Sequence, residues 1–282
     1  MDVRTFKLYN SKGSELDLMS KSHFLSSPSG LGYSRNNTFR QVGERFILVS
    51  SKQNQGTIEG TIILAPSDIY KNYQELVSFL SYSPLQIKYT PYTGGGDYFR
   101  DVVVSKLEKT EIDKNGYMSC PISFQCITPW YRKYYSASGN SSSGGLAWIW
   151  EVTFDTGFSS GQDMVIEFDS DSRLDSPCKV SIHGPIANPR WEHRVNGSLV
   201  GQGKINTTVP AGYNLIISNL QGSDIGIYAT NGTLIRSVYG LADFTKDRFI
   251  TIKNGRNAIR FYGDNSEVVP IRAEGRLYYE SV

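Results

Sequence analysis

The second half of the chain constrains the fold most, because it is a run of short strand-like segments separated by turn-forming dipeptides. Three of the turns are Asn196-Gly197, Asn231-Gly232 and Asn254-Gly255, and Asn-Gly is the strongest short pattern for a β-hairpin. Short strands at regular spacing, with no helix between them, predict a β-sandwich or barrel. The expected strands are 163–169, 178–183, 190–195, 212–219, 226–228, 233–236, 248–252, 258–262 and 271–279.

The first half of the chain is also mostly β by pattern. Residues 3–9 alternate between polar and apolar side chains and, with residues 15–18, predict a hairpin. A second hairpin is expected from 45–51 and 56–64. The Ser-, Gly- and Asn-rich residues 20–38 predict a long loop. Further strands are expected over 85–89, 98–106 and 117–127.

One helix is expected in the first half. Apolar side chains follow one another at helical spacing from Ile69 to Leu80. Ser67 or Asp68 supplies the N-cap, and the helix ends near Ser81, before a proline. The pattern predicts a helix that covers one face of a sheet.

A change in composition suggests where the chain divides. Residues 136–145 are nearly all Ser, Gly and Asn, which is the composition of a flexible linker. We therefore expect an N-terminal domain over 1–131, a linker over 132–145 and a C-terminal domain over 146–282. A surface loop within a single domain is the competing interpretation.

Charge and cysteine content exclude several classes of protein. The 282 residues carry 29 basic and 27 acidic side chains, so we expect neither sequence-specific nucleic-acid binding nor attraction to an anionic membrane. Cys120, Cys126 and Cys178 are an odd number without C-x-x-C spacing, which predicts buried thiols and no zinc site.

The N-terminus lacks the apolar region of a signal peptide, and the longest apolar clusters are too short to insert into a membrane. Synthesis in a cytoplasm is therefore expected.

No pattern in the sequence predicts catalysis, a metal or a cofactor. His23, His183 and His193 are the available histidine bases, and no G-x-S-x-G motif accompanies them. The glycines at 94–96 lack the Lys-Ser/Thr pair of a phosphate-binding loop and predict a hairpin tip. The acids within 167–171 contain enough carboxylates for a glycosidase, but they are also typical of a strand end and a solvated turn.

The segment from residue 186 to 192 is the one candidate binding site. Asn188, Arg190, Trp191 and Glu192 are residue types that bind sugars through an aromatic platform and hydrogen bonds to hydroxyl groups. The Asn-Pro-Arg string also resembles part of a galectin motif, although Ile186 occupies the position of the galectin histidine. An Asn-Pro turn that begins a strand is the alternative, and it is the interpretation we prefer.

The order of landmarks resembles the distal tail protein of phages with long, flexible, non-contractile tails. Each motif alone is weak, but their order and spacing cover most of the chain. The stretches that carry the resemblance are Pro84–Tyr89 with Tyr98–Val102, Tyr117–Phe124 with Thr128–Tyr131, and Gly184–Pro189 with Asn254–Asn257.

The resemblance implies a structural protein of the virion tail tip, made in the cytoplasm of a bacterial host. It implies an N-terminal belt β domain with one helix and a C-terminal galectin-like β-sandwich. Six belt domains would form a hexameric ring between the tail-tube protein and the tail-tip hub protein. The C-terminal domains of some members hold receptor-binding proteins, but this chain shows no obvious insertion for them. The alternative hypothesis is a carbohydrate-binding module that recognises host cell-wall glycans.

Overall fold

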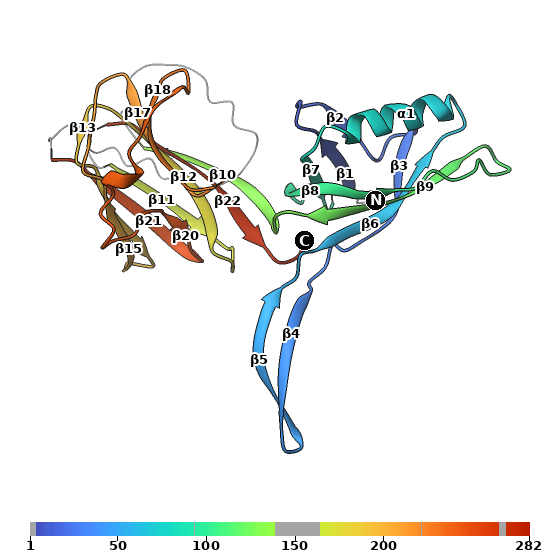
Figure 1. Ribbon diagram of the computed structural model, residues 1–282, viewed down its shortest axis with the longest axis horizontal. Helices are drawn as coiled ribbons and strands as arrows, with labels where there is room; N and C mark the ends of the chain where they lie inside the picture. The colour runs from blue at the N-terminus through green and yellow to red at the C-terminus, as the bar shows by residue number, and fades with distance from the viewer. Residues whose placement is uncertain (1–3, 93, 139–163, 221, 265–268) are drawn as a thin grey trace. The chain divides into compact units, whose positions relative to one another are not determined.

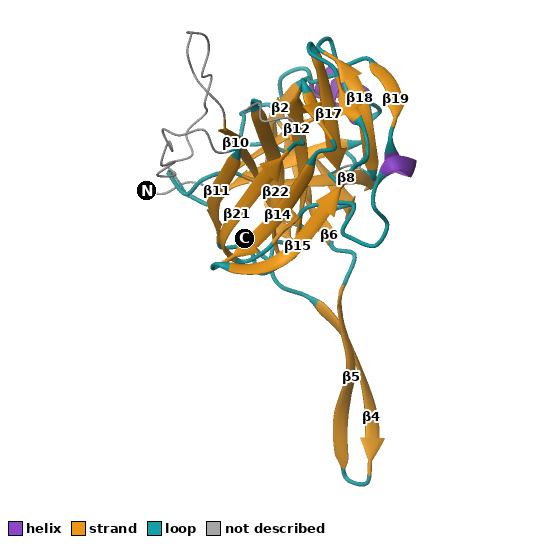
Figure 2. Ribbon diagram, turned by 90° about the vertical axis from the view of Figure 1, so that its left-hand side faces the viewer, coloured by secondary structure: helices purple, strands orange, loops and turns teal. Residues whose placement is uncertain are grey.

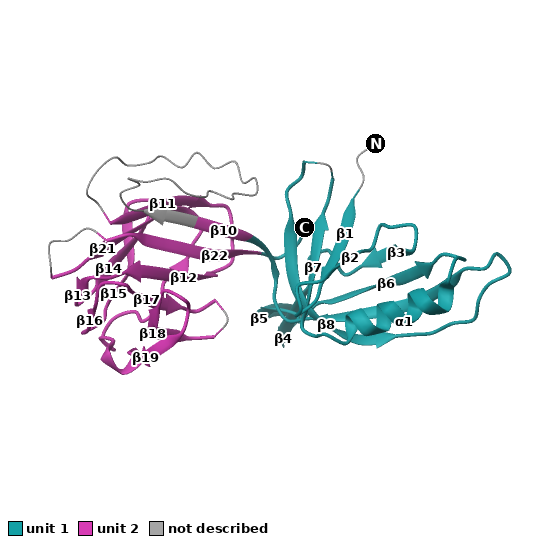
Figure 3. Ribbon diagram, turned by 90° about the horizontal axis from the view of Figure 1, so that it is seen from above, with its two compact units in different colours: residues 1–132, 279–282 teal, residues 133–278 magenta. Residues whose placement is uncertain are grey.

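Strands dominate the structure, which is a computed structural model describing residues 4–92, 94–138, 164–220, 222–264 and 269–282 (Figure 1). The chain divides into two compact units. Unit 1 comprises residues 1–132 and 279–282, and unit 2 comprises residues 133–278, as Figure 3 shows in two colours. The chain therefore passes from one unit to the other twice. The mostly β fold class predicted from the sequence is confirmed.

Unit 1 contains most of the chain's first ten strands and its single described α-helix. In chain order the elements are β1 (Thr5–Tyr9), β2 (Glu15–Asp17), β3 (His23–Ser29), β4 (Arg35–Val42), β5 (Arg45–Gln53), β6 (Thr57–Leu64), α1 (Ile69–Leu80), β7 (Leu85–Thr90), β8 (Tyr98–Leu107) and β9 (Met118–Cys126). Strand β10 (Trp130–Ser138) begins in unit 1 and continues into unit 2.

The main sheet of unit 1 is antiparallel and closes on itself. Its strand order is β3-β6-β9-β8-β7-β1-β2. Leu18 closes the sheet, because its N–H donates to Phe6 O in β1 at 3.0 Å and its carbonyl accepts from Leu25 N in β3 at 2.8 Å. Met19 and Phe24 form a further β-bridge at the same place. Closure leaves fewer unpaired strand edges exposed to other chains.

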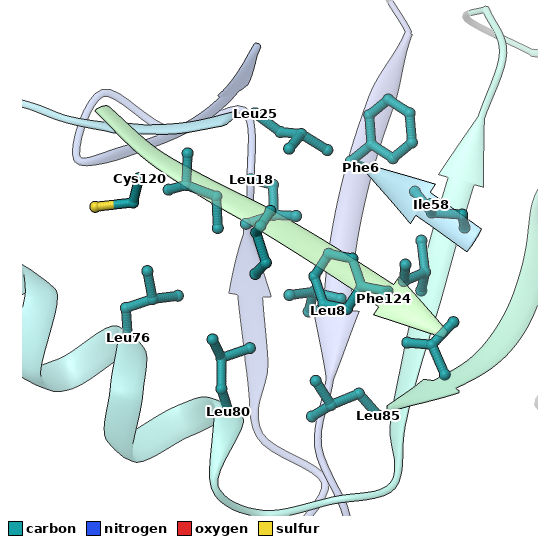
Figure 4. Close-up of a cluster of buried hydrophobic side chains, with 14 of the residues drawn as sticks. Phe6, Leu8, Leu18, Leu25, Ile58, Leu76, Leu80, Leu85, Cys120 and Phe124 are labelled. Atoms are coloured by element: carbon teal, nitrogen blue, oxygen red, sulfur yellow. The ribbon is translucent and has the colours of Figure 1, made fainter. Parts of the chain in front are cut away.

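The core of unit 1 follows from alternation along the strands. Phe6 and Leu8 of β1 are buried while their neighbours are not, because successive side chains of a strand point to opposite faces. Helix α1 begins after Asp68, as predicted, and buries Leu76 and Leu80. Figure 4 shows these helix residues in the same buried cluster as Phe6, Leu8, Leu18 and Phe124.

Unit 2 is built mainly from two antiparallel sheets, and apolar side chains of both are buried. Its elements are β11 (Val165–Ser170), β12 (Ser176–His183), β13 (Ile186–Ala187), β14 (Arg190–Val195), β15 (Ser198–Lys204), β16 (Thr208–Val209), β17 (Tyr213–Ser218), β18 (Asp224–Ala229), β19 (Leu234–Ser237), the short 3-10 helix Tyr239–Leu241, β20 (Thr251–Ile252), β21 (Gly255–Tyr262) and β22 (Ile271–Tyr279). The sheet orders are β19-β18-β17-β12-β22-β10 and β11-β21-β14-β15. This arrangement supports the predicted β-sandwich, whereas a specifically galectin-like fold stays a prediction.

Two of the Asn-Gly turns connect paired strands as expected. Asn196-Gly197 joins β14 to β15, and Asn231-Gly232 joins β18 to β19. The third, Asn254-Gly255, does not form the expected hairpin, because β20 before it pairs with β12 and β21 after it pairs with β11 and β14. Strand β15 was also missed, since its glycines disfavour a strand by propensity.

Two predictions for the first half are wrong. The expected loop over 20–38 contains β3 and the first half of β4. The expected hairpin of 45–51 with 56–64 does not form, because β5 pairs with β4 and β6 pairs with β3 and β9. Ser- and Asn-rich composition resembles a loop, but here cross-strand pairing overrides that local preference.

The predicted linker lies partly in a strand. Residues 132–138 belong to β10, where Tyr134 is buried and packs against Phe168 in a tilted ring pair with centroids 4.3 Å apart. Residues 139–145 lie outside the described part of the chain. The linker proposal therefore concerns those seven residues, and the domain limits drawn from it remain a proposal.

Candidate functional site

The β4–β5 hairpin is the part of unit 1 whose strands pair with no other described strand. Its two strands pair with each other and form a two-stranded sheet of their own. Figures 1 and 2 show the hairpin projecting from the rest of unit 1 as a free, twisted ribbon. Every residue of β4 is exposed, and so are residues 45–49 of β5.

The sequence at the tip specifies the turn of this hairpin. Val42 pairs with Arg45, which leaves the two-residue loop Gly43-Glu44. Gly43 has a φ of 62°, and glycine at the first loop position is typical of a type II′ turn. A bulge between Thr38 and Phe39 shifts the register along the ribbon.

The outer part of the hairpin has two different faces. Residues that pair directly across an antiparallel ladder point to the same side. Phe39 pairs with Leu48 and Gln41 pairs with Phe46, so one face is mostly apolar. The other face carries the pairs Arg40–Ile47 and Val42–Arg45. On the apolar face, Phe46 is 70% exposed and Leu48 is 52% exposed.

The root of the hairpin is attached to unit 1 through polar contacts. Arg35 forms an ion pair with Glu280, near the C-terminal end of the chain. Its Nη1 also donates to Ser51 Oγ at 3.3 Å, which ties the two strands together. Asn54 Nδ2 donates to Ser34 Oγ at 3.4 Å just below the strands. The hairpin is therefore fixed at one end and free along its length.

An isolated two-stranded ribbon is marginally stable in water, because it has no third strand or core to bury its side chains. Exposed clusters of large apolar side chains on soluble proteins mark interaction surfaces. The hairpin combines both properties. Its geometry therefore fits a surface that another polypeptide covers.

The four predicted sugar-binding residues do not form a common face. Trp191 is 2% exposed, and its indole lies over Gly203, where a Cβ would be 2.0 Å from the ring. Arg190 and Glu192 alternate to the opposite face of β14. Because Trp191 is buried, it does not offer a stacking surface to a ligand.

Asn188 and Arg190 converge on a single carboxylate instead. Asn188 Nδ2 donates to Asp264 Oδ2 at 2.8 Å, and Arg190 Nη1 lies 3.3 Å from Asp264 Oδ1. Glu192 lies 3.3 Å from Arg194 Nη2 in a separate surface ion pair. The structure thus brings Asn188 and Arg190 together and leaves Glu192 and Trp191 apart from them.

The histidines are held by uncharged groups. His23 contacts Ser22 Oγ at 3.0 Å, His183 contacts Asn214 Oδ1 at 2.9 Å, and His193 contacts Asn257 Oδ1 at 2.9 Å. Burial lowers the pKa of His193. None of these recorded contacts places a carboxylate on a histidine ring, which is the usual way to orient a catalytic base.

The surroundings of Glu167 in β11 and of the three cysteines are typical of residues with a structural role. Glu167 forms an exposed ion pair with Arg256 at 2.9 Å. All three cysteines are free and buried, as predicted, and burial raises the pKa of Cys178 to about 12. In the described part of the chain no group of three metal-binding side chains gathers, and no helix there is long and apolar enough to span a bilayer.

Sequence reasoning missed the hairpin as a functional element. Two patterns were present in the sequence. One is the Gly43-Glu44 pair, which suits a two-residue turn, and the other is the apolar run Phe46–Val49, which is exposed in the structure. The sequence pattern predicts that this run is part of a strand that pairs with residues 56–64. Only the pairing of β5 with β4 shows that it has no core to cover.

Comparison with known proteins finds a family that matches most of unit 1. The family described as "Distal tail protein, N-terminal domain" matches residues 5–127. No curated protein matches the chain by sequence. Among solved structures, the phage p2 baseplate in its activated conformation with Sr aligns with a TM-score of 0.63 and 16% identity, over 99% of this chain and 100% of that chain. The p2 baseplate with Ca gives the same values.

A second solved protein shares the fold. The SPP1 Dit (gp 19.1) protein, described as a paradigm of the hub adsorption apparatus in phages that infect Gram-positive bacteria, aligns with a TM-score of 0.64 and 9% identity. The alignment covers 97% of this chain and 99% of that chain. These likenesses establish the fold over both units, and the match over residues 5–127 establishes the relationship in unit 1. Residues 5–127 therefore match the family described as "Distal tail protein, N-terminal domain", and the chain as a whole shares the fold of the solved phage p2 baseplate and SPP1 Dit proteins.

Proposed function

We propose that the protein forms a hexameric ring at the tip of the phage tail, in which the β4–β5 hairpin of each copy packs against a neighbouring copy. The ring joins the tail-tube protein on one side to the tail-tip hub protein on the other. The observation that carries this proposal is the hairpin itself, with its exposed Phe39, Phe46 and Leu48. The description of SPP1 Dit as a hub protein supports it by analogy.

The hairpin has the reach and the apolar surface for such a contact. Strand β5 has nine residues, which at about 3.3 Å per residue gives a ribbon about 30 Å long. Burying one large apolar side chain contributes roughly 1.5–3 kcal/mol. A hairpin that packs on a different surface of the next copy makes a heterologous contact, and such contacts form closed rings when the rotation between copies closes.

The assembly state tests this proposal directly. Light scattering behind size-exclusion chromatography, at several protein concentrations, should give six times the 31.5 kDa chain mass. Negative-stain images of the same peak should show rings with a central hole. If the protein stays monomeric alone and also when co-expressed with the tail-tube and hub proteins of its phage, the ring proposal is wrong.

A matched pair of substitutions tests the role of the hairpin. Leu48→Asp places a charge on the apolar face of β5, and Leu234→Asp does the same on β19 of unit 2, where the leucine is 50% exposed against 52% for Leu48. We expect Leu48→Asp to abolish the hexamer and leave thermal stability nearly unchanged, whereas Leu234→Asp keeps the hexamer. Equal behaviour of the two variants would contradict a contact through the hairpin.

Carbohydrate binding by unit 2 is the alternative function, and its support is narrower. Asn188 and Arg190 form an exposed polar cluster with Asp264, and the Arg190 guanidinium lies 5.8 Å from the Tyr262 ring centroid. Tyr262, and not Trp191, is therefore the aromatic side chain beside this cluster. Attachment of receptor-binding proteins to unit 2 is a further proposal drawn from the family resemblance.

A glycan array of bacterial cell-wall polysaccharides separates the alternatives. Under the carbohydrate hypothesis the protein binds specific glycans, and Arg190→Ala abolishes the binding without unfolding unit 2. Absence of binding on the array, together with ring formation, leaves the assembly role alone.

A further inference from the structure

Arg100 is a buried cation in unit 1. It lies in β8 and is 6% exposed. Its Nε donates to the carbonyl of Thr128 at 2.9 Å, and its guanidinium carbon lies 5.5 Å from the Trp130 ring centroid. These contacts involve Nε and one face of the guanidinium. They do not involve the two terminal nitrogens, Nη1 and Nη2.

No carboxylate balances this charge among the described residues. The recorded ion pairs and hydrogen bonds of the described chain give Nη1 and Nη2 of Arg100 no partner. Asp101, the next residue, contacts Gln86 and Tyr131 instead. Burial lowers the pKa of the Arg100 guanidinium, but an arginine stays protonated in proteins. A buried charge without a partner is costly, so such a group normally has one.

The guanidinium borders a pocket of about 290 Å³. The pocket is lined by residues 53–56, Arg100 and residues 126–129, and Arg100 is its single charged residue. Gly56 lies directly against the guanidinium, because a Cβ at this position would be 2.5 Å from Nη2. The backbone of Gly56 is not in the left-handed region, so the glycine is needed here for space. The missing side chain leaves the Nη edge open to the pocket.

We propose that this pocket, which we call the Arg100 pocket, is a binding site for a carboxylate. Two terminal guanidinium nitrogens match the two oxygens of a carboxylate in a bidentate pair. The remaining lining side chains are neutral, so the charge of Arg100 makes the pocket positive and favours an anion over a cation.

The position of the pocket indicates where the carboxylate comes from. Residues 53–56 follow directly on β5, so the Arg100 pocket lies at the root of the β4–β5 hairpin. This step rests on the proposed ring, in which the hairpin and its surroundings contact a neighbouring copy. In the ring, the ligand is an acidic side chain of that neighbouring copy.

Acetate is a suitable probe for the site in the isolated protein. Thermal unfolding is followed while sodium acetate replaces sodium chloride at constant ionic strength. A ligand that binds the folded state raises Tm in a saturable manner, so we expect a saturable rise with acetate. Gly56→Ala keeps Arg100 but fills the space beside Nη2, and it should abolish the rise.

Two further variants control the interpretation. Gly32→Ala adds the same methyl group at a glycine that has open space and an ordinary φ, and it should keep the acetate response. Arg100→Gln should lose the response even if it also lowers Tm. An acetate response that survives both Gly56→Ala and Arg100→Gln would overturn the site.

Competition in the assembled protein identifies the source of the carboxylate. Acetate at constant ionic strength should dissociate the hexamer, and rings of the Gly56→Ala protein should be weaker and insensitive to acetate. Rings that ignore acetate, in a protein whose Tm responds to it, would show that the neighbouring copy does not supply the ligand. If the protein never forms rings but its Tm responds to acetate, the carboxylate site is supported and the proposed function is contradicted. If rings form and Tm does not respond to acetate, the proposed function is supported and the site is contradicted.

Discussion

Trp191 and Arg190 are neighbours in sequence that belong to opposite faces of one strand. Trp191 lies in the core of unit 2, and Arg190 lies on its surface with Asp264. The tryptophan therefore contributes to the stability of unit 2. The arginine is available for contacts at the surface. Loss of ligand binding in a Trp191 variant would report unfolding and not a lost contact.

Truncation of Trp191 should destabilise unit 2. Trp191→Ala removes a buried indole and leaves a cavity over Gly203, at a cost of about 3–5 kcal/mol. Arg190→Ala removes an exposed ion pair and should cost less than about 1 kcal/mol. Urea unfolding followed by circular dichroism measures both. A Trp191→Ala protein as stable as Arg190→Ala would contradict the packing described for β14.

The sequence predicts which residues of β14 share a face, but not which face is buried. Alternation along 190–195 places Trp191 and His193 on one face and Arg190 and Glu192 on the other. It does not indicate which face another sheet covers, because that depends on residues far away in the chain. The same limit applies to Arg100, whose strand was predicted but whose neighbours Gly56 and Thr128 come from other segments.

The β4–β5 hairpin shows where local patterns fail for a whole element. Asn36 and Asn37 are residues that strands disfavour, yet they lie in β4 because β5 pairs with them. The helix and the β1–β2 hairpin were predictable, since their periodicity and turns are local. The pairing partner of β5 was not predictable, because the pattern of a strand does not indicate which other strand it pairs with.

Trypsin should detect the exposed hairpin before any other described strand. A marginal ribbon opens locally at low free-energy cost, so we expect early cleavage after Arg40 and Arg45 in the monomer. Arg194 serves as the control, because β14 is paired on both sides by β15 and β21. Mass spectrometry of the fragments identifies the sites.

Assembly should change that proteolysis. In the proposed ring the apolar face of the hairpin would be covered, so cleavage after Arg40 and Arg45 should slow relative to the monomer. Equal cleavage rates in the two states would show that the hairpin stays free in the ring.

Unit 1 of the molecule is assembled from both ends of the chain. Tyr279 packs edge-on against Tyr98, with ring centroids 5.5 Å apart, and Glu280 holds Arg35 at the root of the hairpin. The last four residues thus complete a unit whose other residues are the first 132. Unit 2 occupies the sequence between them.

Removal of the Tyr279 ring should weaken unit 1 while unit 2 keeps its stability. Tyr279→Ala loses an aromatic pair and part of the packing on the unit 1 core, worth about 1–2 kcal/mol. Hydrogen exchange should become faster in strands β1, β7 and β8 and stay unchanged in β17 and β18. Tyr135→Ala, which removes a tyrosine that is 68% exposed, is the matched control. Uniform acceleration across both units would contradict this division.

The nested order of the two units also sets the timing of synthesis. A ribosome makes residues 279–282 after the whole of unit 2, so unit 1 waits until unit 2 has been synthesised before it receives Tyr279 and Glu280. Nascent chains, and chains that stop early, then carry a hairpin whose root lacks its ion pair. Products that terminate before residue 279 would on this basis enter a growing virion less readily than chains that include Tyr279 and Glu280.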